Sequence, residues 1–347
     1  MKMKLLAAVV AASTLAATSA NAEVKVSTKG GLKVESGDYK FEFGGRIQYD
    51  YNRAELNGVV DEDQFDTRRA RVFARGNISK NWKFKTQFNV EGDGFEDLYL
   101  RYTGWGSAAN VTIGNQKQPF GLEELTSSKD ISMLERSALT ELFAIGRSEG
   151  VQLHGKLDGN ITYGVSAFFE DVDATDEGEE VGFATRWTWA PVKTDSSVFH
   201  LGAAYYTIDE SSAFGFEAAA TSGPFHIQAE YADGEADDID ADGFYIQAGY
   251  ILTGESRPYS GGKFKRVKPG SKAGAWEIVA RYEDGNGNFS DIELGTLVED
   301  AEASAFGIGL NYYAHKNVRI GVNYTDGDID GTDDDGNEFR VRFQLTF

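Results

Sequence analysis

The sequence has no cysteine, only four histidines and only five prolines in 347 residues. The absence of cysteine excludes disulfide bonds, thiol catalysis and cysteine-bound metals, and four histidines leave little room for a zinc enzyme. No apolar run near 18 residues follows the first 22, so the rest of the chain contains no transmembrane helix. Glycine (40 residues) and aromatic residues (13%) are plentiful. Abundant glycine and aromatics with little proline suit a large antiparallel sheet.

The N-terminal segment has the pattern of a secretory leader. Residues 1–4 carry two lysines, residues 5–12 are apolar, and Ala20-Asn21-Ala22 is a small-residue cleavage site. We therefore predict a signal peptide over 1–22 and one mature domain over 23–347. An exported chain without a transmembrane helix can still span a bilayer, but only as a closed β-barrel.

Apolar and polar residues alternate along segments of about ten residues, as in a membrane β-barrel that turns its apolar side chains toward lipid. In the last segment Phe343, Leu345 and Phe347 alternate with Arg342 and Gln344. We predict an all-β protein, a transmembrane antiparallel β-barrel of about 16 strands, which is wide enough for a water-filled channel. The expected strands are 39–53, 65–79, 81–91, 95–103, 109–117, 149–158, 160–171, 179–190, 197–207, 212–221, 223–233, 241–253, 275–285, 303–314, 316–326 and 338–347.

Charge is unevenly distributed along the chain, whose formal net charge is −21. Five segments hold thirty-two acidic residues and no base, so the remainder of the mature chain is basic. No exposed basic run dominates, which argues against nucleic acid as a partner. Because tight turns alternate with longer connections, we expect the short turns and both chain ends in the periplasm and the acidic segments in outer loops. These segments are 55–66, 170–180, 233–242, 283–302 and 326–338.

Two long connections depart from the acidic pattern. The connection from Lys117 to Arg147 contains apolar residues that a solvated surface loop would not need, so we expect it to fold into the barrel as a constriction. The connection 254–274 is basic and lies on the periplasmic side by strand count, and loops this long are usually functional or disordered. We interpret it as functional. The residues that we single out in these two segments are Glu123, Glu124, Ser127, Ser128 and Lys129 in the first, and Lys263, Lys265, Arg266 and Lys268 in the second.

Basic residues outnumber acidic ones at positions whose parity points into the lumen, and rings of arginine and lysine line anion pores. Strict alternation puts Arg69 and Arg71 in the lumen and Arg68 outside, unless a bulge or the rim frees Arg68. The alternative interpretations are pairing with lumen acids, plain solvation, and contact of rim arginines with lipopolysaccharide. The lumen bases are Arg46, Arg69, Arg71, Arg75, Lys83, Lys85, Arg101, Lys156, Arg186, Arg281, Arg319, Arg340 and Arg342; the acids are Glu42, Asp50, Asp97, Glu170, Glu217, Glu230 and Glu277.

Several stretches of the sequence resemble the phosphate-selective porin O and P family. They are GRIQYDY, DTRRARV, IGNQKQPFGLEELTSSKDISMLER, and LTGESRPYSGGKFKRVKP followed by GAWEIVARY. The resemblance covers nearly the whole mature chain and implies a sixteen-stranded barrel, usually a trimer, in a Gram-negative outer membrane. It also implies that the 118–147 loop narrows the pore, that the 254–274 turn enters from the periplasm, and that an arginine ladder leads to a central lysine. The matching motifs assign ladder and constriction roles to Arg68, Arg69 and Lys117.

The sequence therefore predicts an outer-membrane porin that passes small hydrophilic solutes by diffusion, with a bias toward anions and phosphate. It requires no cofactor, and its expected partners are phosphate or other small anions, outer-membrane lipid and lipopolysaccharide, and two further copies of the chain. Two alternatives remain: a general or cation-tolerant porin without phosphate specificity, and a structural or adhesive barrel without a channel.

Two further classes of site are disfavoured by the sequence. Asp326, Asp328 and Asp330 followed by Gly331 match the opening of a calcium loop, but Asn337 stands at the twelfth position, where that motif needs glutamate. A solvated acidic hairpin is the better interpretation, with calcium as the alternative. An enzyme would need a nucleophile motif, and no G-x-S-x-G occurs, so we predict that the protein is not an enzyme.

Overall fold

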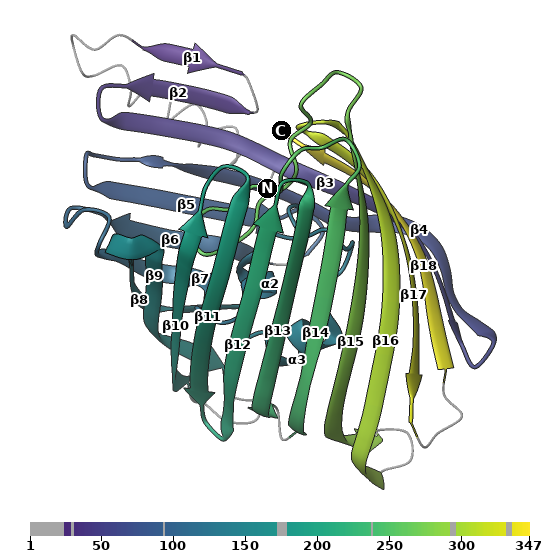
Figure 1. Ribbon diagram of the computed structural model, residues 1–347. Helices are drawn as coiled ribbons and strands as arrows, with labels where there is room; N and C mark the ends of the chain where they lie inside the picture. Colours follow the sequence, from purple (N-terminus) through teal and green to yellow (C-terminus); the bar gives the residue numbers. More distant parts are fainter. Residues whose placement is uncertain are drawn as a thin grey trace.

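The computed structural model contains one antiparallel sheet that closes on itself (Figure 1). The predicted signal peptide lies outside the residues that the structure describes. Among the described residues, no helix combines the length and the apolar character that crossing a membrane requires. The described residues are 24–28, 31–92, 94–171, 179–236, 239–291, 296–330 and 335–347.

Sixteen strands of the described chain form the barrel wall, as the sequence predicts. Each pairs with its neighbour along the chain, and β18 pairs with β3 from Gly336↔Leu56 to Thr346↔Arg46, which closes the barrel. The strands are β3 (Tyr39–Leu56), β4 (Val59–Asn77), β5 (Trp82–Asn89), β6 (Phe95–Tyr102), β7 (Asn110–Lys117), β8 (Arg147–Leu157), β9 (Ile161–Asp171), β10 (Glu179–Lys193), β11 (Ser197–Ile208), β12 (Ser211–Ser222), β13 (Phe225–Ala236), β14 (Ile239–Ile251), β15 (Ala275–Asp291), β16 (Thr296–His315), β17 (Val318–Ile329) and β18 (Asp335–Thr346).

Two short strands precede the barrel, and the sequence analysis missed them. β1 (Lys25–Ser27) pairs with β2 (Leu32–Ser36), and β2 pairs with the first residues of β3. Phe347 exchanges two backbone hydrogen bonds with Gly45 of β3, at 2.8 and 3.0 Å. β2 therefore pairs with the first residues of β3, which lie beyond the end of β18. We call the end of the barrel where β3 begins and β18 stops the terminal end.

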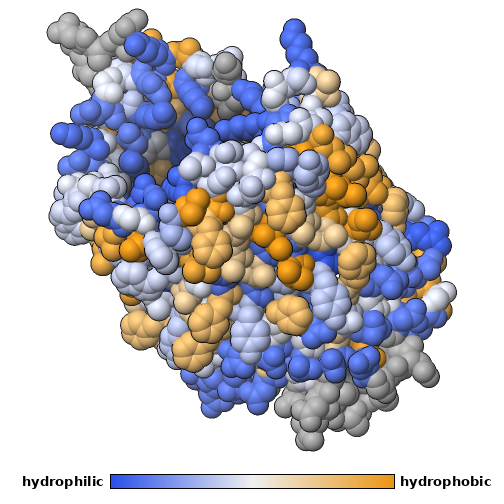
Figure 2. Space-filling view, viewed as in Figure 1, coloured by the Kyte–Doolittle hydropathy of each residue, from blue (hydrophilic) through white to orange (hydrophobic). Residues whose placement is uncertain are grey.

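Most outward-facing residues of the wall are apolar and exposed, whereas most lumen-facing residues are buried and many of them are polar. In β18, Phe343 is 48% exposed, but its neighbours Arg342 and Gln344 are 0% and 2% exposed. Figure 2 shows the apolar side chains as a band across the wall, with hydrophilic residues at both ends. A band of this kind suits contact with lipid. Because the lumen-facing residues are buried, other segments of the chain must occupy part of the lumen.

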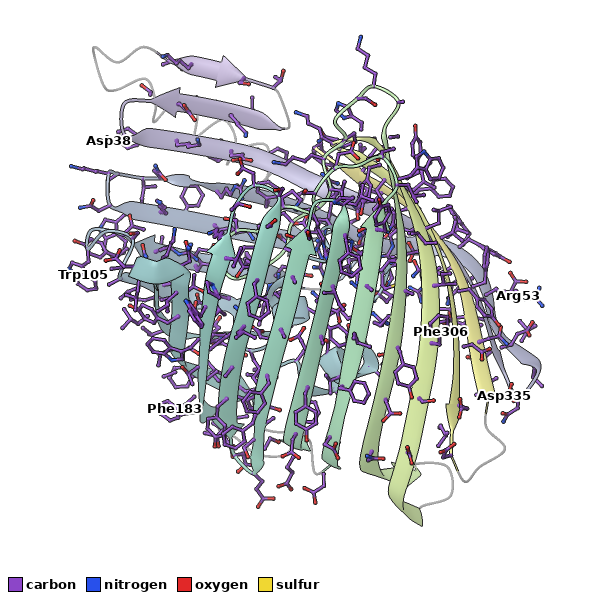
Figure 3. The ribbon with its side chains drawn as sticks, in the orientation of Figure 1. Asp38, Arg53, Trp105, Phe183, Phe306 and Asp335 are labelled. Atoms are coloured by element: carbon purple, nitrogen blue, oxygen red, sulfur yellow. The ribbon has the colours of Figure 1, made fainter. Side chains whose placement is uncertain are left out.

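The strands continue farther from the terminal end than predicted, and part of the acidic sequence lies in strands instead of loops. β3 and β4 are joined by the tight turn Asn57-Gly58, whose φ values of 52° and 72° suit an Asn-Gly hairpin turn. The prediction that β4 begins at 65 was wrong by six residues, because acidic residues are tolerated where both faces of a hairpin meet water. Figure 3 places Arg53 and Asp335 at this outer end and Asp38 at the terminal end.

Candidate functional site

The connection 118–146, which we call the inner loop, folds into the barrel as predicted. It contains two short helices, α2 (Leu122–Leu125) and α3 (Ala138–Phe143). Phe120 and Phe143 pack in one buried cluster with lumen residues of β9 to β13. Other apolar residues of the loop, which prompted the prediction, are also buried: Leu122, Ile131, Met133 and Leu134. The lumen residues of that cluster are Phe168, Ala184, Ala204, Tyr206, Ala213 and Ala232.

Basic side chains of the wall donate hydrogen bonds to backbone carbonyls of the inner loop. Arg319, which is 1% exposed, donates from Nη1 to the carbonyl of Ile131 at 2.7 Å. Arg281 donates to the carbonyls of Glu135 and Arg136 at 3.0 and 3.1 Å. Buried carbonyls need donors, and here the wall supplies them. These two arginines were predicted to face the lumen, and they do, but they brace the loop.

Acidic side chains of the wall hold backbone N–H groups of the same loop. Both oxygens of Glu230 accept hydrogen bonds at the start of α2, from the N–H groups of Leu122 and Glu123 at 2.6 Å each. Glu283 accepts from the N–H of Ala138, at the start of α3, at 2.7 Å. Acids and bases of the wall thus supply hydrogen-bond partners to the backbone of this loop.

The connection 254–274, which we call the basic turn, enters the lumen from the terminal end and meets the inner loop. Arg257 is buried, lies 4.4 Å from the ring centroid of Phe264 and donates to the carbonyl of Asp130 at 3.3 Å. Arg186 of β10 donates to the carbonyl of Gly262 at 2.8 Å. Two segments from opposite ends of the barrel therefore meet inside the lumen.

A water-accessible space lies beside the two segments, lined by described residues of the wall from β3 to β10. This space, which we call the chamber, has a volume of about 640 Å³. Among its described lining residues, eight are lysine or arginine and one, Asp97, is an acid. The chamber is therefore strongly basic. Its basic residues are Arg46, Lys85, Arg101, Lys117, Arg147, Lys156, Arg186 and Lys263.

Four of the chamber bases are engaged in ion pairs. Lys85 and Arg147 share Asp97, the latter at 3.0 Å from Nε to Oδ1. Lys117 is bound by both the carboxylate and the carbonyl of Glu124. The fourth is Arg186 of β10, whose Nη2 lies 2.6 Å from Oε1 of Glu217 in β12.

The other four bases have no carboxylate within ion-pair distance in the described part of the chain. Arg46 donates to the hydroxyl of Ser127 at 3.2 Å, and Arg101 donates to Thr112 at 2.9 Å. Lys156 of β8 and Lys263 of the basic turn complete this set. These charges face a water-filled space and can bind a mobile anion by charge-assisted hydrogen bonds. The unpaired set is Arg46, Arg101, Lys156 and Lys263.

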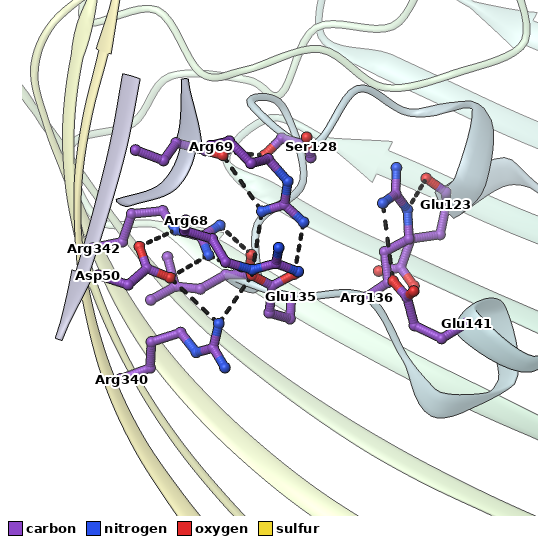
Figure 4. Close-up of polar contacts among 12 residues, drawn as sticks. Asp50, Arg68, Arg69, Glu123, Ser128, Glu135, Arg136, Glu141, Arg340 and Arg342 are labelled. Carbon is purple, nitrogen blue, oxygen red and sulfur yellow. Dashed lines mark hydrogen bonds and ion pairs between the residues drawn. The ribbon is translucent and has the colours of Figure 1, made fainter. Parts of the chain in front are cut away.

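The densest arginine run of the sequence lies outside the chamber lining. The register of β3 against β4 shifts between Gln48↔Arg69 and Tyr49↔Thr67, which leaves Arg68 in a bulge. The bulge that would free Arg68 from strict alternation is therefore present. Arg68 and Arg69 both form ion pairs with Glu135 (Figure 4). Arg340 and Arg342 contact the same carboxylate, while Arg71 and Arg75 pair with Glu96 and Glu42.

Of the five inner-loop residues singled out, Ser127 is the one found among the described residues that line the chamber. Glu124 does not line it, but it forms an ion pair with the lining residue Lys117. Glu123 is buried and accepts a hydrogen bond from the N–H of Ser137 at 2.9 Å. Ser128 offers its carbonyl to Gln48 of the wall at 3.3 Å. Lys129 forms an ion pair with its neighbour Asp130.

In the basic turn, Lys263 lines the chamber and Lys268 is exposed. Arg266 donates to the hydroxyl of Thr346 at 3.0 Å, and Lys265 is partly buried. Arg147 was not singled out from the sequence. Its signal is its place as the first strand residue after the inner loop, opposite Lys117 in the register.

The candidate calcium residues Asp326 and Asp328 stand in β17, opposite Asn337 and Asp335 of β18. Residues 331–334 of this motif lie outside the described residues. In the part of the chain that the structure describes, no three histidine or acidic side chains are grouped to hold a metal ion.

Comparison with known proteins gives the barrel a family. The sequence profile described as phosphate-selective porin O and P matches residues 41–213 and 207–347. Porin O of Pseudomonas aeruginosa is 31% identical over 416 aligned residues, which cover 95% of this chain and 94% of that protein.

Solved structures share the fold at low sequence identity. An anion-selective porin from Comamonas acidovorans has a TM-score of 0.61 at 13% identity, covering 89% of this chain and 100% of that one. The outer-membrane protein OmpT of Vibrio cholerae, in its trimer form, has a TM-score of 0.58 at 14% identity over the same shares. The profile match spans nearly the whole barrel, so the chain belongs to the phosphate-selective porin O and P family and is a porin of the Gram-negative outer membrane.

Proposed function

We propose that this porin lets small anions, phosphate among them, diffuse through the chamber. The observation that carries the proposal is the excess of bases over acids in the chamber lining, with four bases free of a carboxylate partner among the described residues. Several modest binding sites favour conduction over one tight site, because an ion must also leave. The name of the family and the anion selectivity of the Comamonas porin support the same class of solute.

The proposal extends to the setting of the channel. The terminal end faces the periplasm, residues 1–22 are removed on export, and residues 23–347 form the mature domain. Three copies assemble through their apolar walls, as the trimeric form of the Vibrio protein suggests, and rim residues meet lipid and lipopolysaccharide. The chain acts as a channel and not as an enzyme, and it needs no cofactor.

A general or cation-tolerant porin is the second candidate, because acidic residues crowd the outer ends of the strands. Glu62 stands opposite Ala54, eight residues beyond Arg46 on β3. Eight strand residues span about 26 Å, whereas salt at physiological strength screens charges over about 8 Å. The acidic rim is therefore expected to lower anion capture at the mouth without cancelling the charge of the chamber.

Neutralising two unpaired bases tests the proposal. Arg101→Gln together with Lys156→Gln is expected to lower the anion-to-cation permeability ratio about threefold or more, since half of the free positive charge is lost. The matched control is Lys80→Gln, which neutralises an exposed lysine in the β4–β5 turn. Reversal potentials in a potassium chloride gradient report the ratio. Equal ratios in wild type and double variant would place the anion path elsewhere.

The free lysine of the basic turn predicts a pH dependence. Burial, together with the nearby charges of Lys265 and Arg186, lowers the pKa of Lys263 to about 7. As pH rises through about 7, the ammonium loses its proton and the chamber loses one positive charge, so anion selectivity is expected to fall. Chloride should be the test ion, because phosphate titrates in the same range. Lys263→Gln is expected to reduce the step; a step of unchanged size in this variant would assign it to another group.

A further inference from the structure

One carboxylate of the inner loop is surrounded by four arginines of the wall (Figure 4). Arg68 Nε lies 2.9 Å from Oε1 of Glu135, Arg69 Nη2 lies 3.0 Å from Oε2, and Arg340 Nη1 lies 3.0 Å from Oε1. Arg342 contacts Oε1 as well. We call these four residues the arginine cage. The side chain of Glu135 is 22% exposed, so this carboxylate is still reached by water.

The members of the cage differ in their other partners. Arg342 and Arg340 also bind Asp50, and Arg340 also pairs with Glu338. The other two cage members have no carboxylate partner besides Glu135 in the described residues. Removing the charge of Glu135 would therefore leave two arginines, one of them with a side chain 41% exposed, free to bind an anion.

The cage lies between the outer end and the chamber. On the lumen face of β3, Asp50 stands opposite Arg342, and Arg46 of the chamber lies four residues nearer the terminal end. Four strand residues correspond to about 13 Å. The inner loop links the cage to the chamber, because Ser127, eight residues before Glu135, accepts a hydrogen bond from Arg46 of the chamber. An anion that enters from outside thus reaches the cage before the chamber.

The cage and its carboxylate reproduce the chemistry of an oxyanion bound by arginine. Carboxylate and phosphate both present oxygens to the planar guanidinium fork, and both form short charge-assisted hydrogen bonds with it. Without the charge of Glu135, the two arginines that have no other carboxylate would hold a phosphate dianion more tightly, and a tightly held ion blocks a channel. The surrounding charges hold the pKa of Glu135 well below its usual range, so the carboxylate stays ionised at neutral pH.

We propose that Glu135 is a built-in competitor that occupies the arginine cage in place of a permeating oxyanion, and so sets how weakly phosphate-like anions are held on their way to the chamber. This inference rests on the proposed function, since it concerns anions that use the chamber. It assigns Glu135 a role in specificity in addition to its structural contacts with the wall.

The test is the block of chloride current by inorganic phosphate in planar bilayers. Glu135→Gln is expected to lower the half-blocking phosphate concentration about tenfold relative to wild type, because the cage loses its internal anion. Adding Arg68→Gln to this variant is expected to reverse most of the gain. The matched control is Glu141→Gln in the same loop, whose carboxylate is 64% exposed and 4.0 Å from Arg136; it should leave the block unchanged.

Different outcomes separate this inference from the function on which it rests. Wild type blocked by phosphate, with an equal half-blocking concentration in Glu135→Gln, overturns the role of Glu135 and leaves the anion channel intact. Wild type that is cation-selective and indifferent to phosphate overturns both. If Glu135→Gln fails to assemble, Glu135→Asp takes its place, since it keeps the charge but withdraws the carboxylate by one methylene. It is expected to tighten the block about threefold, and an unchanged value overturns the inference.

Discussion

Deleting residues 122–142 is expected to raise the single-channel conductance several-fold. These residues carry α2, all of α3 except Phe143, and backbone groups of the loop that the wall binds, such as the carbonyl of Ile131 and the N–H of Ala138. Without them, the cross-section would be limited by the sixteen-stranded wall and the basic turn, and barrels of this size enclose an aqueous channel. Conductance in planar bilayers, measured on protein that has assembled, is the readout.

The deletion should leave the anion preference of the pore in place. Arg281 and Arg319 now donate to carbonyls of the loop. After the deletion they would face water, where they add positive charge to a wider pore. We therefore expect conductance to rise and anion preference to persist. An assembled deletion variant with unchanged conductance would show that the loop does not limit the pore.

Replacing Lys117 by Glu is expected to shift the reversal potential strongly toward cation selectivity. The ammonium of Lys117 binds Glu124 and faces the chamber, so the substitution changes the local charge by two and sets two carboxylates against each other. Like charges about 4 Å apart repel by about 4 kcal/mol where the effective dielectric constant is about 20. The inner loop should loosen at this point as well, which would appear as noise in the open-channel current.

Lys117→Gln is the matched variant, because it removes the charge without introducing a repelling one. Its reversal potential is expected to lie between those of wild type and Lys117→Glu, and its open-channel current is expected to be less noisy than that of Lys117→Glu. If Lys117→Glu and Lys117→Gln behave alike, the lost contact with Glu124 explains the change and the charge of the chamber does not. If neither moves the reversal potential, Lys117 has no part in selectivity.

Much of the fold could be predicted from the sequence, because period-two alternation in a barrel is set by the membrane and the lumen and not by long-range contacts. Phe343 and Arg342 face lipid and lumen as alternation requires. The sequence did not predict β1 and β2, because strands of three and five residues at the terminal end are too short to show an alternating pattern. The outer hairpin of β3 and β4 was missed because the acids in 59–64 conceal the strand, although the Asn57-Gly58 turn was visible.

The candidate site could be predicted only in part, because parity gives the face of a residue and not its partner. Arg101 and Arg319 have the same parity and the same side chain. Arg101 meets the chamber, whereas Arg319 meets the carbonyls of the inner loop. That difference depends on where a loop from the other side of the barrel comes to lie. Lys263 likewise reaches the chamber only because the basic turn folds inward.

The charge of the chamber sets selectivity in this account, and the reversal potential of the wild-type channel in a potassium chloride gradient measures it most directly. We expect a potential displaced toward the chloride equilibrium value, with phosphate reducing the chloride current when it is added to either side. A potential displaced toward the potassium value, with no effect of phosphate, would contradict the account and show that the acidic rim controls permeation.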